Sequence, residues 1–122
     1  MNFYFSKIVV DQNFEEAIIL SQKNYEKAIE GTAWMYLGRT MGKLDSSQQS
    51  NAEEFVQRGI KILTNLYLKP YYSQGYLFLG EIYSYSDHRE KALGYLHMAE
   101  DNFREMEMDY WLDKTNDILG KL

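Results

Sequence analysis

The fold of this chain is decided by the stretch Tyr76-Leu77-Phe78-Leu79-Gly80-Glu81-Ile82-Tyr83, together with Ala92, Leu96 and Ala99. Tyr76, Leu79 and Tyr83 are spaced by three and four residues, so they share one face of a helix. Ala92, Leu96 and Ala99 mark one face of a second helix in the same way. Gly80 then falls where the two helices approach too closely for a side chain. The pattern predicts two packed antiparallel helices.

An earlier copy of the same pattern begins at Trp34. Trp34-x2-Leu37-Gly38-x2-Met41 matches the later stretch position for position, and Gly38 and Gly80 lie 42 residues apart. A half-copy, Phe14 to Leu20, resembles Arg89 to Leu93. We therefore expect helical hairpins that repeat along the chain, with Trp34, Leu37 and Met41 as packing residues of the earlier copy.

Helices account for nearly all of the sequence in this interpretation. We expect them near 14–29, 31–44, 51–68, 71–85, 88–106 and 108–121, with a possible short helix at 2–10. The polar turn at 45–50 is the one long connection, so neighbouring helices should pack antiparallel. Ser50-x-x-Glu53 and Asp87-x-x-Glu90 have the spacing of capping boxes at helix starts. The predicted fold class is all-α.

The spacing of these residues resembles the tetratricopeptide repeat, and the resemblance extends over nearly the whole chain. It implies antiparallel helical hairpins stacked in a right-handed superhelix and closed by a C-terminal capping helix. Residues 1–122 would form a single domain, with a partial repeat at 1–30, repeats at 31–69 and 70–106, and the capping helix at 107–122.

The second half of the chain resembles one group of repeat proteins more specifically. The stretches Lys69 to Glu81, Arg89 to Leu93 and Phe103 to Leu112 look like the C-terminal repeat block of large bacterial signalling proteins. In that group the repeats follow an ATPase module, often with an adenylate/guanylate cyclase or transcription-regulator module. The resemblance implies a non-catalytic regulatory part of such a protein, because no phosphate-binding GxxxxGK[ST] loop or paired cyclase carboxylate motif occurs here.

The composition narrows the range of partners. The 122 residues carry a net charge of −5, which argues against nucleic acid, since phosphates are neutralised by a basic surface. The absence of cysteine excludes disulfides and thiolate metal sites. Residues 1–10 are apolar but too short to span a bilayer, and Lys7 interrupts them. We therefore expect a cytoplasmic protein with protein or peptide partners and no membrane partner.

The resemblance also implies a binding surface, because the first helix of each hairpin lines the concave side in this family. Met35 and Leu77 would be apolar anchors there, and Arg39, Lys43 and Glu81 would orient a bound peptide by charge. The same surface could instead pack against further repeats or a flanking domain. The expected groove residues are Thr32, Met35, Arg39, Lys43, Gln74, Leu77, Glu81, Ser84 and Tyr85.

Catalysis has little support in this sequence. His97 has Glu100 and Asp101 three and four residues further on, a spacing that could hold a metal, but two or three ligands without a fourth make a poor site. We expect no enzyme activity, metal or cofactor. The expected function is a protein–protein interaction module. The alternative is self-association through the apolar amino-terminal segment that contains Phe3, Phe5, Ile8 and Val9.

Overall fold

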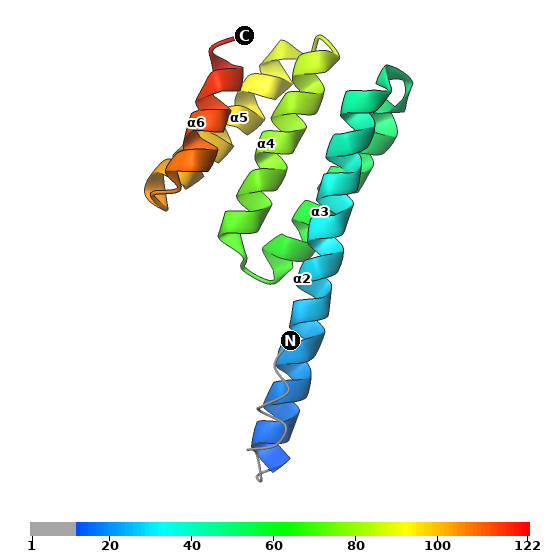
Figure 1. The fold of residues 1–122 in the computed structure, drawn as a ribbon, viewed down its shortest axis with the longest axis vertical. Helices are drawn as coiled ribbons and strands as arrows, with labels where there is room; N and C mark the ends of the chain where they lie inside the picture. Colours follow the sequence, from blue (N-terminus) through cyan, green and yellow to red (C-terminus); the bar gives the residue numbers. More distant parts are fainter. Residues whose placement is uncertain (1–11) are drawn as a thin grey trace.

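Residues 12–122 are described by a computed structural model, and all regular structure within them is helical (Figure 1). This confirms the predicted all-α class. The expected helix at 2–10 and the apolar amino-terminal segment lie outside these residues. The helices are α2 (Gln12–Leu44), the short 3₁₀ helix η1 (Ser46–Gln48), α3 (Gln49–Asn65), α4 (Lys69–Tyr85), α5 (Arg89–Glu105) and α6 (Asp109–Leu119).

Consecutive helices run antiparallel, and α4 lies in the middle of the molecule (Figure 1). α3 packs on both α2 and α4, and α5 packs on both α4 and α6. α2 also contacts α4, and α4 contacts α6. The amino-terminal half of α2 reaches beyond the ends of the other helices (Figure 1). α4 is thus buried on several sides, while within residues 12–122 α3 and α4 cover α2 along only part of its length.

The sequence interpretation is wrong about a break between residues 29 and 31, because α2 is one continuous helix of 33 residues. Gly31, at the expected start of the second of these helices, lies inside α2 and serves helix packing. A Cβ atom there would lie 3.0 Å from side-chain atoms of both Ile62 and Leu63 on α3. The glycine therefore permits a close contact and does not terminate the helix, whose flanking residues contain no proline.

The two glycines of the repeated pattern occupy the predicted contacts. A Cβ atom on Gly38 would lie 2.6 Å from the carbonyl oxygen of Ala52 on α3. One on Gly80 would lie 2.5 Å from Leu96 on α5. Each glycine thus lets the first helix of a hairpin approach the second, as expected from the sequence.

The two helices α3 and α5 bury the same positions at a spacing of 40 residues. Both have 17 residues and present their small and large apolar side chains in the same order. The buried pairs are Ala52 and Ala92, Val56 and Leu96, Gly59 and Ala99, and Leu63 and Phe103. α3 ends at Asn65 and not near residue 68 as expected. Gly38 and Gly80 are 42 residues apart but α3 and α5 are offset by 40, so the first hairpin has two more residues between its glycine and its second helix.

The three turns that join α3, α4, α5 and α6 share one geometry. Each has a residue with positive φ, and the following amide donates to the carbonyl five residues back, as in a Schellman motif. The residues with positive φ are Tyr67, Asp87 and Glu107, at 58°, 61° and 56°. The bonds run from Leu68 to Leu63 (3.0 Å), from His88 to Tyr83 (3.1 Å) and from Met108 to Phe103 (2.9 Å).

The capping boxes that the sequence suggested at the starts of α3 and α5 are not formed. The N-cap residues of α3 and α5 are Gln48 and His88, and neither donates or accepts a side-chain capping bond. Asp87 takes the left-handed position of a turn instead. A side-chain cap is found at η1, where Asp45 accepts a bond from the amide of Ser47. The expected polar turn at 45–50 is therefore mostly helical.

Within residues 12–122, no helix is both long enough and apolar enough to cross a membrane.

Candidate binding groove

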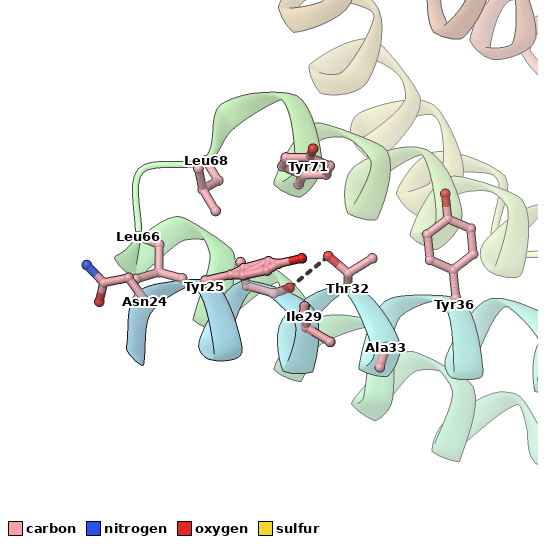
Figure 2. Close-up of a pocket in the computed structure, with 10 residues that line it drawn as sticks. Asn24, Tyr25, Ile29, Thr32, Ala33, Tyr36, Leu66, Leu68 and Tyr71 are labelled. Carbon is pink, nitrogen blue, oxygen red and sulfur yellow. Dashed lines mark hydrogen bonds between the residues drawn. The ribbon is translucent and has the colours of Figure 1, made fainter. Parts of the chain in front are cut away.

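An apolar groove of about 790 Å³ lies between the middle of α2 and the start of α4. None of the described residues that line it is charged, so it suits an apolar occupant. Leu68 and Tyr71 face Tyr25 and Thr32 across it (Figure 2). The lining residues are Asn24, Tyr25, Ala28, Ile29, Thr32, Ala33 and Tyr36 from α2, Leu66 and Leu68 from the α3–α4 turn, and Tyr71 from α4.

Helical spacing brings the α2 residues of the groove together. Tyr25, Ile29, Thr32 and Tyr36 follow one another at intervals of four, three and four, so they share one helical stripe. Ile29 has 55% of its side-chain surface exposed, although isoleucine is usually buried. The hydroxyl of Thr32 donates to the carbonyl of Ala28 at 2.8 Å (Figure 2), so its polar group is satisfied within the helix. The stripe is therefore effectively apolar.

Tyr36 is the most C-terminal of the α2 residues that line the groove, and two contacts with α4 hold it in place. Its hydroxyl donates to the side-chain oxygen of Gln74 at 3.1 Å, and its ring meets Phe78 edge to face at 5.0 Å. Gln74 is buried and Tyr36 is exposed, so this hydrogen bond is partly shielded from water. These contacts fix the wall of the groove before any partner binds, which lowers the entropic cost of binding.

A cluster of three charges lies further along the same two helices. The buried carboxylate of Glu81 on α4 accepts from Arg39 on α2 at 2.9 Å, and Lys43 lies 3.8 Å away. The guanidinium of Arg39 also lies 4.7 Å from the centre of the Phe78 ring. Both cations pair with the one carboxylate, which holds α2 against α4 and leaves the cluster with a net positive charge. The Glu81 carboxylate is therefore engaged within the chain.

Tyr85 lies beside this cluster. Burial raises the pKa of its hydroxyl, and the Glu81 carboxylate adds to the rise while Arg39 opposes it. A shallow depression of about 250 Å³ forms here between α4 and the end of the chain. Its lining residues are Glu81, Ser84, Tyr85, Ile118, Lys121 and Leu122.

The structure separates the nine residues expected to form one surface. Met35 and Leu77, the expected anchors, have 0% and 2% of their surface exposed, so neither can reach a partner. Arg39, Lys43 and Glu81 form the ion cluster described above. The remaining four divide between the other features: Thr32 lines the apolar groove, Gln74 supports Tyr36, Ser84 donates to the Glu81 carbonyl at 2.6 Å, and Tyr85 lines the shallow depression.

The error has a physical cause. Each of these helices contacts more than one neighbour, so two faces of α2 and α4 are needed for packing. The sequence interpretation assigned packing to one face and left Met35 and Leu77 on a free face. Conversely Leu37, expected to pack, has 46% of its surface exposed.

Sequence reasoning missed Tyr25, Ile29, Leu66, Leu68 and Tyr71 as groove residues. A signal for the α2 part was present, because Tyr25, Ile29 and Tyr36 have helical spacing. The part contributed by Leu66 and Leu68 has no such signal, since these residues belong to a turn.

His97 and Glu100 approach one another as their spacing predicts. The Nδ1 atom of His97 lies 3.2 Å from a carboxylate oxygen of Glu100, and the other oxygen of this carboxylate pairs with Arg104 at 3.5 Å. Among the residues that the structure describes, no group of three histidine, cysteine, aspartate or glutamate side chains could hold a metal ion.

No family model matches the chain, and no curated protein or solved structure matches it significantly. The role of the groove is therefore inferred from its own residues.

Proposed function

We propose that this chain is a non-catalytic protein–protein interaction module that binds an apolar peptide segment in the groove between α2 and α4. The observation that carries the proposal is an open groove with no charged lining residue, built on exposed Tyr25, Ile29 and Tyr71. Monomeric soluble proteins seldom leave such surface uncovered unless it is used. An aromatic or aliphatic side chain in the groove would gain most of its affinity from desolvation.

The proposed architecture behind this surface is a tetratricopeptide-like stack of helical hairpins in a right-handed superhelix. The glycine contacts of Gly38 and Gly80 and the 40-residue equivalence of α3 and α5 support it. α2, α4 and α6 would then be the first helices of successive hairpins. In keeping with the sequence resemblance, the module would belong to a cytoplasmic bacterial signalling protein of the ATPase or cyclase type and would contact a peptide or flanking domain.

Peptide selection with matched variants tests this function. Phage-displayed random dodecapeptides are selected on the full chain, and the binding of synthetic copies is measured by fluorescence anisotropy. Ile29→Glu should weaken binding by about tenfold or more, because a carboxylate in an apolar groove loses its hydration. Met98→Glu, on a helix away from the groove and with 45% of its surface exposed, is the control and should change binding less than about twofold.

Two results would contradict the proposal. One is that no peptide is enriched over an unrelated helical protein. The other is that enriched peptides bind the Ile29→Glu and Met98→Glu variants equally well, since the groove would then not be their site.

Self-association is the second candidate function, and the concentration of exposed apolar side chains on α2 favours it. The large apolar side chains exposed there are Ile19, Leu20, Tyr25, Ile29, Tyr36, Leu37 and Leu44. Two copies could cover these surfaces by pairing α2 with α2. Light scattering at micromolar concentration tests this, with a doubled mass expected for a dimer and the mass of a single chain counting against it.

A further inference from the structure

Three groove residues of α2, Thr32, Ala33 and Tyr36, have counterparts on α4 that are covered, whereas Tyr67 and Tyr71, the counterparts of Tyr25 and Ile29, are exposed. The 42-residue spacing of Gly38 and Gly80 relates the two helices and pairs Thr32 with Gln74, Ala33 with Gly75, and Tyr36 with Phe78. On α4 all three positions are buried. A Cβ atom on Gly75 would lie 2.4 Å from Ile60 and 2.7 Å from Met35, and Gln74 accepts from Tyr36. The helices that precede α4 thus contribute the cover at these positions.

By the same relation, cover over Thr32, Ala33 and Tyr36 would come from the part of the chain that precedes α2. The part of the chain that directly precedes α2 is residues 1–11, with the sequence Met-Asn-Phe-Tyr-Phe-Ser-Lys-Ile-Val-Val-Asp. We propose that the aromatic residues Phe3, Tyr4 and Phe5 of this segment bind in the α2–α4 groove of their own chain. The proposal does not depend on the binding of an external peptide.

The chemistry of the segment fits the groove. Phe3, Tyr4 and Phe5 carry no charge and stand side by side in the sequence, while the groove has no charged lining residue. Aromatic side chains bury a large area and pair favourably with other rings, which Tyr25 and Tyr71 offer. The two charged residues, Lys7 and Asp11, lie nearer α2 and outside the aromatic run.

The length of the segment fits as well. Tyr25 and Ile29 lie 13 and 17 residues beyond Gln12, which places them about 20 and 26 Å along the helix axis. Phe5 and Phe3 precede Gln12 by 7 and 9 residues, so an extended segment running back along α2 reaches about 23 to 32 Å. The aromatic run therefore reaches the level of the groove, with about one residue left for the reversal.

Cysteine pairs test the placement cleanly, because the chain has no cysteine of its own. The full chain carrying Tyr4→Cys and Tyr25→Cys is oxidised at low concentration, and the disulfide is identified by non-reducing electrophoresis and peptide mass spectrometry. The control is Tyr4→Cys with Leu44→Cys. Leu44 is 81% exposed but lies about 48 Å along α2 from Gln12, beyond the reach of the segment. We expect an intrachain disulfide in the first variant and none in the control.

A second comparison separates binding from the proximity that a tether alone provides. Phe3→Ser and Phe5→Ser, added to the Tyr4→Cys/Tyr25→Cys chain, should slow the disulfide about tenfold, because the apolar contribution to binding is lost. An unchanged rate would overturn the proposal, since the segment would then only be tethered nearby. A disulfide that forms only between chains would overturn it as well, because the occupant would be a second copy.

The outcome is distinguishable from that of the proposed function. An intrachain disulfide that depends on Phe3 and Phe5 supports this inference even if no external peptide binds. If the groove binds both its own aromatic segment and external peptides, the Phe3→Ser/Phe5→Ser chain should bind the selected peptides more tightly than the unmodified chain. Its groove would then be vacant more of the time.

Discussion

Replacing Gly59 by alanine tests the close crossing of α2 and α3 on which the fold depends. A Cβ atom on Gly59 would lie 2.4 Å from the carbonyl oxygen of Gly31 and 2.4 Å from the Cγ atom of Met35. Met35 could rotate, although it is fully buried. The Gly31 oxygen belongs to the backbone of α2 and cannot move without displacing the helix. Alanine at this position must therefore push α2 and α3 apart.

The size of the effect follows from two opposing terms. Overpacking a core costs about 1 to 3 kcal/mol, and a clash with a backbone atom puts Gly59→Ala at the upper end of this range. Alanine is more favourable than glycine in a helix interior by about 1 kcal/mol. The expected net loss is about 2 kcal/mol in the free energy of unfolding, or a melting temperature lower by about 8 °C.

Gly94→Ala is the matched control, because Gly94 also lies inside a 17-residue helix. A Cβ atom on Gly94 would face open space, with no atom of another element within 4 Å. It should stabilise the protein by up to about 1 kcal/mol through helix propensity alone. Urea unfolding followed by far-ultraviolet circular dichroism measures both variants. If Gly59→Ala proves as stable as Gly94→Ala, the reasoning about the crossing is refuted.

Three further predictions concern a turn, the ion cluster and a core tyrosine. Tyr67→Gly should raise the free energy of unfolding by about 0.5 to 1 kcal/mol, because the exposed Tyr67 has positive φ; urea unfolding would refute this if stability fell. Glu81→Gln should lower the free energy of unfolding by about 1 to 2 kcal/mol, and a double-mutant cycle with Arg39→Met should show coupling. Additive effects of the two substitutions would contradict a stabilising ion pair. Burial raises the pKa of Tyr83 to about 12, with Glu53 adding to the rise, so the stabilisation present below pH 10 is lost as the pH rises towards 12. Tyr83→Phe should make thermal stability fall less over this window; an equal fall would contradict the assignment.

The parts of the fold that the sequence predicted are those governed by local spacing. Gly38 and Gly80 were identified as close helix contacts because each is flanked by large apolar residues at helical intervals, and both lie at such contacts. The helices from Lys69 onwards begin and end within about two residues of the expected positions. Periodicity and spacing are properties of neighbouring residues, so they are readable without the tertiary structure.

The parts that could not be predicted depend on how many neighbours a helix has. A period of 3.6 residues shows that Met35 and Leu37 lie on different faces of α2, but it does not show which face is covered. Met35 is buried because α2 contacts both α3 and α4, while Leu37 points to a side without a neighbouring helix among residues 12–122. The groove was missed for the same reason, since it arises where α2 extends past its neighbours.

The turns illustrate a second limit. Tyr67, Asp87 and Glu107 take a conformation that usually favours glycine, and nothing in their side chains indicates it. The conformation is imposed by the hydrogen bonds from Leu68, His88 and Met108 that end each helix and by packing of the following helix. Local preference is overridden here at a cost of about 1 kcal/mol per turn, which packing offsets.

The two ends of the helical stack differ in a way that limits how it can associate. The exposed positions of α6 are largely polar, with Asp113, Asn116 and Asp117 along the helix, whereas α2 exposes a stripe that includes Ile29 and Leu37. Head-to-tail stacking of copies would press the polar end against the apolar one and desolvate carboxylates without a partner. Pairing α2 with α2 would therefore desolvate fewer charged groups than stacking α2 on α6, so a closed dimer is expected over an open filament if copies associate.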